Sequence, residues 1–309
     1  MDITSILLII GGLALFEIIV SVDNAIVNAD VLSTMSAKAR RWFLIWGLLF
    51  AVFVVRGLLP WIIVWVMNPD LGFIGSLTAT FSSNPAVIES IEKSTPILLA
   101  GGGVFLLFIF FHWLFLEPKQ YGLFGEKFFH KQGAWFYAVV SIILCVLVWS
   151  ALQINPIMAF SIVVGSTAFF ITHGFKQTAE ETEKELVSGH SNKSDIAKIM
   201  YLEVIDTTFS IDGVLGAFAF TLSVPLIILG NGIGALVLRQ LTVGNIDRIR
   251  KYMFIKNGAM YSIFALGVIM LADAFGYHVP HFVSPIITFS IVGYFFLKSH
   301  KALKNGNIV

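Results

Sequence analysis

Long runs of apolar residues, separated by short polar stretches, follow one another along almost the whole chain. Each run is roughly 20 residues long, the length that an α-helix needs to cross the hydrocarbon core of a bilayer. Charged residues, prolines and glycines divide the pattern into predicted spans near residues 3–28, 42–67, 97–116, 135–152, 156–172, 198–222, 225–241, 257–275 and 282–298. The pattern therefore predicts an all-α polytopic membrane protein with about nine transmembrane helices.

Composition agrees with this fold class and excludes several others. Of the 309 residues, 57% are hydrophobic and 13% are charged, against about 25% charged in an ordinary soluble domain. A net charge of +1 without clustered basic residues argues against a nucleic-acid partner, and a single cysteine argues against a disulfide scaffold. The partner that the composition requires is the lipid bilayer.

Basic residues predict the orientation in the membrane. Nearly all lysines and arginines fall in the loops after predicted spans 1, 3, 5 and 7 and in the C-terminal tail, whereas the loops on the other side contain Lys93. Lysine and arginine in short loops favour the cytoplasmic side. We therefore expect a multi-pass protein of the cell membrane with its N-terminus outside and its C-terminus in the cytoplasm.

Two spans share a polar motif, an acid followed after three residues by serine, an aliphatic residue and aspartate. It occurs as Glu17, Ser21 and Asp23 in the first span, and as Asp206, Ser210 and Asp212 in the sixth. The next span in each case has glycine and arginine at the same spacing, Gly47 with Arg56 and Gly230 with Arg239. Since spans 1 and 6 are an odd number apart, they cross in opposite directions, which predicts an inverted-topology internal repeat.

This repeat defines the expected organisation of the chain. The predicted parts are a first repeat (1–117, spans 1–3), a linker with spans 4 and 5 and a cytoplasmic loop (118–197), a second, inverted repeat (198–276, spans 6–8), and span 9 with a cytoplasmic tail (277–309). We expect segment 175–196 to be mainly a solvated linker. Segment 68–95 fits either an interfacial helix or re-entrant lid, or a disordered loop.

Ionisable residues within the spans indicate a function. Each costs about 2.5–3.5 kcal/mol at the centre of a membrane helix unless it is paired or hydrated. The ionisable residues within the two motif-bearing regions are Glu17, Asp23, Arg56, Glu203, Asp206, Asp212 and Arg239. The acids outnumber the arginines, which suits a divalent cation, although two acids paired with the arginines would also lock the bundle.

The predicted metal ligands are oxygen donors of these spans. The set consists of Glu17, Asp23, Asn24, Glu203, Asp206, Ser210 and Asp212, with Ser21 and Asn28 as secondary candidates and Arg56 and Arg239 as charge-compensating residues. Oxygen-only sites suit Mg²⁺, Ca²⁺ or Mn²⁺ rather than softer metals. In-span His112 and His173 fall outside the motif, and we expect them to be buried, hydrogen-bonded histidines.

Helical geometry separates the second aspartate of each motif from the rest. At 100° per residue one face of the first span presents Glu17, Ser21, Asn24 and Asn28, and one face of the sixth presents Asp206, Ser210 and Gly213. Asp23 and Asp212 lie about 120° away from these stripes. Either each helix is locally unwound there, or this aspartate gates the site or carries a proton beside it. Gly213 and Gly216 would permit unwinding in the sixth span.

At these residues the sequence resembles the TerC family, which includes Alx and belongs to the LysE transporter superfamily. The segments FEIIVSVDNAIVNA and EVIDTTFSIDGVLGAF are similar to the two signature segments of that family, and residues 250–271 are similar to a later span. The resemblance implies export of Mn²⁺ from the cytoplasm, with the intramembrane acids as ligands. Ser210 stands where alanine is more usual and Gly213 where serine is more usual, as in a divergent branch.

The leading hypothesis is thus a Mn²⁺ efflux transporter working by alternating access, with Ca²⁺ or Mg²⁺ as alternative cargo and no organic cofactor. Closely spaced acids titrate as a coupled group, which makes protons a natural counter-ion. We expect no enzyme, because the stretch Gly230–Gly234 lacks the aspartate of an intramembrane protease motif. The alternative is a membrane-integration or assembly factor with a polar groove. The sequence leaves the ion, the coupling and the existence of a homo-oligomer open.

Overall fold

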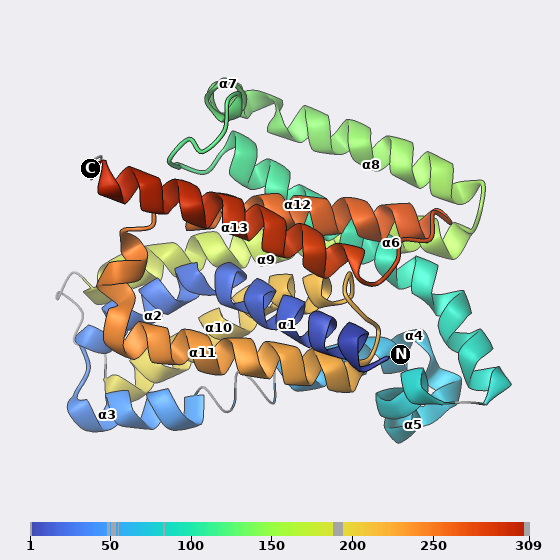
Figure 1. Cartoon of the computed structure of the whole chain (residues 1–309), viewed down its shortest axis with the longest axis horizontal. Helices are drawn as coiled ribbons and strands as arrows, with labels where there is room; N and C mark the ends of the chain where they lie inside the picture. The colour runs from blue at the N-terminus through green and yellow to red at the C-terminus, as the bar shows by residue number, and fades with distance from the viewer. Residues whose placement is uncertain are drawn as a thin grey trace.

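The computed structural model describes residues 2–47, 50, 54, 56–82, 84–187 and 194–305. At several helical positions, including residues 23, 24, 239 and 241–250, it describes the backbone path alone. All regular structure within the described residues is helical. Figure 1 shows most helices running roughly along the longest axis of the molecule, with the C-terminus at its left edge.

The predicted spans coincide largely with helices in their described parts, except that α10 ends at Ala217, before the end of the predicted span 198–222. The main helices are α1 (Ile3–Val20), α2 (Val22–Ser33), α3 (Ala37–Trp42), α4 (Arg56–Met67), α5 (Gly72–Thr78), α6 (Pro85–Phe115), α7 (Glu126–Lys131), α8 (Phe136–Leu152), α9 (Pro156–Val187), α10 (Asp195–Ala217), α11 (Val224–Arg250), α12 (Ile255–Ala274) and α13 (Val283–Lys304), with a π-helical turn at Phe43–Gly47. By length and composition, five helices among the described residues qualify as membrane spans, or six if one bent pair counts as a span. The all-α polytopic membrane fold is confirmed, and the count of nine crossings stays a prediction.

Two segments for which a loop was expected or considered are largely helical in their described parts; for 68–95 this agrees with the helical alternative. Helix α9 continues past residue 172 to Val187, so the first part of the expected linker 175–196 is helical, and residues 188–193 lie outside the described part. Segment 68–95 forms α5, flanked by short 3₁₀ turns, and then the beginning of α6. The chain bends by 107° between α4 and the stretch Pro69–Phe81. This segment therefore folds back as short helices and does not form an irregular loop.

The two motif-bearing helices run in opposite directions. The rings of Phe16 on α1 and Phe220 beyond the end of α10 are 5.7 Å apart, whereas further along the chain Asn28 of α2 contacts Asp206 of α10. Residue numbers thus increase along α1 and α2 in the direction in which they decrease along the adjacent helix α10. This is the direction that the predicted inverted repeat requires of spans 1 and 6.

Other helix pairs also have the directions that alternating crossings require. Helices α1 and α11 are parallel, because Gly230 lies against Leu13 and Gly234 lies against Glu17 one turn later. Helices α6 and α12 are antiparallel, with Gly102 against Met270 and Gly267 against Leu106. Helices α6 and α9 are parallel, because Gly101 lies against Ser161 and, further along both helices, His112 lies against His173. In the predicted numbering these are spans 1 and 7, 3 and 8, and 3 and 5.

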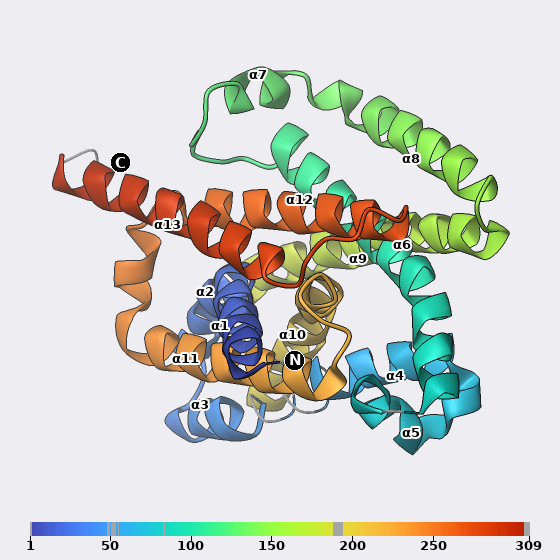
Figure 2. The same cartoon turned by 45° about the vertical axis from the view of Figure 1, so that its right-hand side comes forward.

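Helix α6 forms the centre of the main hydrophobic core. Its residues Phe105, Leu106 and Trp113 are completely buried, and the helix packs between α9 and α12. Figure 2 shows α12 and α13 side by side above the group formed by α1, α2, α10 and α11. Helices of the two proposed repeats therefore pack against each other, which places residues of both motifs in one interior.

Candidate cation-binding site

Glu17 forms the centre of a buried polar cluster on α1. Its side chain is 1% exposed, and Arg56 of α4 lies in an ion pair with it, with Nε 2.8 Å from Oε1. The hydroxyl of Ser21 donates to the same Oε1 at 2.8 Å, and Arg56 Nη2 donates to Ser21 Oγ at 3.3 Å. One carboxylate oxygen of Glu17 is therefore fully engaged, while the other, Oε2, is buried without a hydrogen-bond partner.

The helix break occurs in the first motif and not in the second. Helix α1 ends at Val20, Ser21 forms a turn, and α2 begins at Val22. Helix α10 continues without interruption through Gly213 and Gly216. The interruption is a single residue, because Ser21 N–H still donates to Glu17 O and Ala25 N–H to Ser21 O, so neither helix is unwound at its second aspartate.

Asp206 of the second motif contacts Asn28, further along the first motif-bearing region. It is buried on α10, and Asn28 Nδ2 donates to its Oδ1 at 3.1 Å. The hydroxyl of Ser210 is turned to the backbone carbonyl of Asp206. Helix α10 thus contacts the first motif region at two levels, with Gly213 against Glu17 and Asp206 against Asn28 about two turns away.

Small residues bound the space around Glu17 and Glu203. A Cβ atom at Gly213 would lie 3.0 Å from the unpartnered Oε2 of Glu17. Glu203, one turn before Asp206, has both carboxylate oxygens buried without a hydrogen-bond partner, and one of them lies against Gly47. Buried carboxylate oxygens without partners are costly, and here they belong to both motif-bearing helices.

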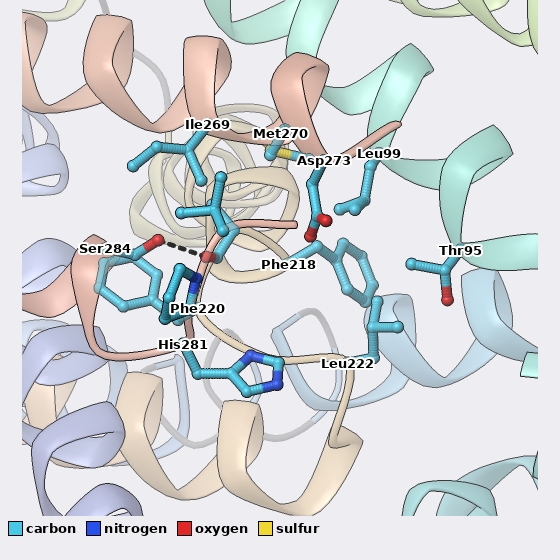
Figure 3. A pocket seen from close by; sticks show the side chains of 13 residues that line it. Thr95, Leu99, Phe218, Phe220, Leu222, Ile269, Met270, Asp273, His281 and Ser284 are labelled. Atoms are coloured by element: carbon cyan, nitrogen blue, oxygen red, sulfur yellow. Dashed lines mark hydrogen bonds between the residues drawn. The ribbon is translucent and has the colours of Figure 1, made fainter. Parts of the chain in front are cut away.

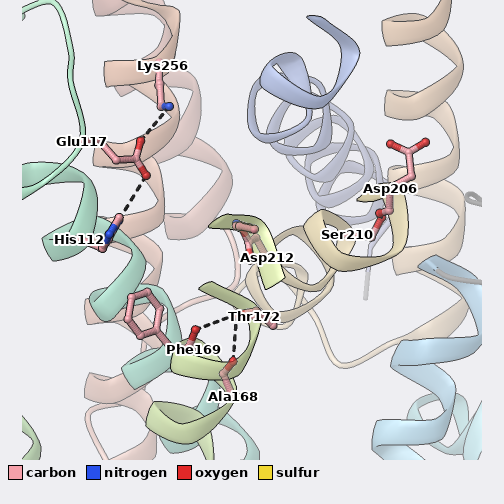
Figure 4. A network of polar contacts seen from close by, with 10 residues as sticks. His112, Glu117, Ala168, Phe169, Thr172, Asp206, Ser210, Asp212 and Lys256 are labelled. Carbon is pink, nitrogen blue, oxygen red and sulfur yellow. Dashed lines mark hydrogen bonds and ion pairs between the residues drawn. The ribbon is translucent and has the colours of Figure 1, made fainter. Parts of the chain in front are cut away.

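Asp212 lies apart from the Glu17 cluster. Lys176 of α9 donates to its Oδ2 at 2.6 Å, and its Oδ1 has no hydrogen-bond partner. Figure 4 shows Asp212 well separated from Asp206 and Ser210, on the side that faces His112 and Glu117. The angular separation of about 120° expected from helix geometry is thus retained, because α10 stays helical.

Lys176 was missed as a partner of this site because it was counted as a loop residue. In the structure it lies within α9, and its side chain is 20% exposed. Its position three residues after His173, on the same helical face, is the signal that could have identified it. Asn231, a polar residue in the middle of α11, was also missed and is buried.

The predicted ligand set is therefore only partly brought together. Glu17, Ser21 and Arg56 form one cluster, Asn28 and Asp206 form a hydrogen-bonded pair, and Asp212 forms a separate ion pair with Lys176. Glu203 lies one turn from Asp206. The side chains of Asp23, Asn24 and Arg239 lie outside the described part of the chain. Among the described side chains, no three histidines, cysteines, aspartates or glutamates are grouped as metal ligands would be.

A second polar group lies where α6, α9 and α12 meet. The rings of His112 and His173 are 3.9 Å apart between centroids, and His112 Nδ1 is 3.4 Å from Glu117 Oε1. Lys256 Nζ is 2.9 Å from the other oxygen of Glu117 (Figure 4). Burial opposes ionisation of Glu117, but the hydrogen bond from His112 and the charge of Lys256 outweigh it and hold the pKa of Glu117 well below its usual range.

Comparison with known proteins gives a family. Residues 22–305 match the model of the family described as DUF475, "Protein of unknown function". Over 91 residues the chain is 32% identical to the "Uncharacterized membrane protein YceF" of Bacillus subtilis (strain 168), which covers 29% of this chain and about a third (35%) of that relative. No solved structure matches. The chain belongs to the DUF475 family.

Proposed function

We propose that this membrane protein transports a divalent cation, with Mn²⁺ exported from the cytoplasm as the favoured cargo. The observation that carries the proposal is the unpartnered Oε2 of Glu17, buried where α1 meets Gly213 of the antiparallel helix α10. A carboxylate oxygen held in a helical membrane interior is a strong ligand for a hard cation. A purely structural pair of Glu17 and Arg56 would leave the second acid, Asp206, uncompensated.

The surrounding residues have the chemistry that such a site needs. Arg56 and Ser21 fix one oxygen of Glu17 and so orient the other. Asn28 provides an amide oxygen that is buried without a partner, next to Asp206. The donors are all oxygens, which Mn²⁺, Mg²⁺ and Ca²⁺ prefer.

The helix break at Ser21 supports alternating access as the mechanism. Discontinuous helices at the interface of inverted repeats are the usual place of ion sites in secondary transporters. The DUF475 family is related to the TerC family, and the resemblance of the two acidic motifs to TerC supports Mn²⁺ as the cargo. Proton antiport is the proposed coupling, because release of a divalent ion leaves neighbouring acids that can accept protons.

The test is flux into proteoliposomes that contain the full chain. We expect Mn²⁺ flux for the wild type, its loss in Glu17→Gln and in Asp206→Asn, and unchanged flux in Glu89→Gln, whose side chain is 65% exposed in a surface ion pair. Ca²⁺ and Mg²⁺ measured in parallel rank the cargo. Absence of flux for every ion, with folded protein, would overturn the proposal and favour the assembly-factor alternative.

Two further measurements address coupling and the role of the remaining motif aspartates. Flux that is indifferent to an imposed pH gradient would exclude proton antiport. Asp23→Asn should abolish transport if the residue binds the ion, whereas a groove for a client peptide would tolerate it because the side chain stays polar. Asp212→Asn, which weakens the pair with Lys176, tests whether Asp212 is needed for transport while lying outside the Glu17 cluster.

A further inference from the structure

Asn231 is a buried polar residue in the middle of the α11 membrane segment. It is 1% exposed, and neither its amide nitrogen nor its amide oxygen has a hydrogen-bond partner. An asparagine in a helical membrane interior is unfavourable unless something satisfies it. A packing role alone would be better fulfilled by leucine, so the amide points to a ligand that is bound during part of the cycle.

The packing of α11 on α1 places Asn231 one turn from the level of Glu17 along the helix axis. Gly230 lies against Leu13, and Gly234 lies against the backbone oxygen of Ala14 and the Cβ of Glu17 at 2.6 and 2.7 Å from an ideal Cβ position. The two helices run parallel, so Asn231 lies one turn, about 4.5 Å along the axis, before the level of Glu17. Gly230 and Gly234 form the face of α11 that contacts α1, and Asn231 lies about 80° around the helix from that face.

In the direction away from Glu17, α11 begins beside a cavity. The cavity has a volume of about 580 Å³, and its polar lining includes Glu92, Thr221, Ser223 and His281. Ser223, which precedes the first residue of α11, is 3% exposed and has an unpartnered hydroxyl. A neighbouring cavity of about 70 Å³ shares Leu222 and His281 and also contains Asp273 (Figure 3).

Unpartnered polar groups thus follow α11 from the acidic cluster to this cavity. Glu17 Oε2 lies at the level of Gly234, Asn231 follows one turn later, and Ser223 lies about 12 Å further along the axis. The cavity is surrounded by the C-terminal ends of α10 and α12 and the N-terminal ends of α1 and α6. The predicted orientation places all four helix ends on the outer side of the membrane. The cavity wall includes the carboxylate of Glu92, whose negative charge suits a departing cation.

We propose that Asn231 contacts the transported cation on an outward route from Glu17 to the cavity lined by Glu92 and Ser223. This inference rests on the proposed function and adds a ligand and a direction to it. The neutral amide oxygen binds a divalent ion more weakly than a carboxylate does, so it suits a residue that accepts the ion from Glu17 and passes it on rather than holding it.

The experiment compares Asn231→Ser with Asn231→Ala, which are similar in volume and differ by one oxygen. Mn²⁺ flux into proteoliposomes and equilibrium Mn²⁺ binding in detergent are measured for both. We expect Asn231→Ala to lose flux at least tenfold while binding stays within threefold of the wild type, and Asn231→Ser to recover a substantial part of the flux. Thr288→Val is the control, because Thr288 on α13 is also fully buried with an unpartnered hydroxyl.

The outcomes separate this inference from the proposed function. If the wild type transports Mn²⁺ and flux is lost equally in Asn231→Ala and Asn231→Ser, both folded, the amide acts by packing and the inference is overturned. Undiminished flux in Asn231→Ala would overturn it as well. A wild type without flux or binding of any divalent ion would instead refute the proposed function. Reduced flux in Thr288→Val would remove the specificity on which the inference depends.

Discussion

Replacing Gly213 with alanine would place a methyl group beside the unpartnered oxygen of Glu17. The new Cβ would lie 3.0 Å from Glu17 Oε2, a contact that the carboxylate can relieve only by moving. Hard cations bind carboxylate oxygens at about 2.0–2.6 Å. If the ion occupies the space on this side of Oε2, the methyl group takes the position that the ion or its water needs.

The effect on stability should be small. Alanine is favoured over glycine within a helix by about 0.8–1 kcal/mol, and moving the Glu17 side chain from its rotamer costs about 0.5–1.5 kcal/mol. These contributions nearly cancel, so the free energy of unfolding should stay within about 1 kcal/mol of the wild type. The affinity for Mn²⁺ should nevertheless fall at least about tenfold, which corresponds to about 1.4 kcal/mol.

The assay is Mn²⁺ binding to the purified protein in detergent, together with thermal unfolding. Gly293→Ala is the matched control, because it lies within α13 and a Cβ there would meet no atom within 4 Å. Gly213→Ser, which restores the residue more usual in the resembling family, should bind better than Gly213→Ala since its hydroxyl offers a ligand. Wild-type affinity in Gly213→Ala would refute the placement of the ion beside Glu17 Oε2.

Three further predictions concern the ion pairs and the topology. Arg56→Gln should lower the free energy of unfolding by about 3 kcal/mol or more, because it leaves the buried carboxylate of Glu17 uncompensated, and adding Glu17→Gln should restore most of the loss. Glu117→Gln should cost about 1–2 kcal/mol at neutral pH; since the pKa of Glu117 is lowered on folding, its contribution is complete above its usual pKa and is lost as the pH falls through the folded value. In a cysteine-free background, an impermeant thiol reagent applied outside should label Lys93→Cys and spare Lys127→Cys.

Each of these predictions has a clear contrary result. An Arg56→Gln variant as stable as the wild type in chemical unfolding would mean that Glu17 is already neutral or hydrated. A Glu117→Gln variant whose stability deficit grows on acidification would contradict the sign of the linkage. Labelling of Lys127→Cys alone in intact cells would invert the proposed orientation, and with it the direction assigned to the route past Asn231.

The sequence could predict the elements because membrane insertion depends on local properties. Length and hydropathy decide whether a segment is helical in lipid, since every backbone polar group there must be bonded within the helix. Because the membrane-spanning segments are otherwise apolar, the acidic residues of both motifs could be recognised in the sequence. The positions of Glu17, Asp206 and Asp212 within helices followed directly, and helix periodicity separated Asp212 from the other two.

The sequence by itself thus determined the fold class, the helices and the unusual acids. Only the tertiary structure decided which partners these acids have, because pairing depends on the relative directions and close contacts of helices far apart in the chain. The parallel packing of α11 on α1 through Gly230 and Gly234 placed Asn231 one turn from the level of Glu17, and the continuation of α9 placed Lys176 against Asp212. Neither contact has a local signal, because a glycine that permits close packing does not specify the helix that it will meet.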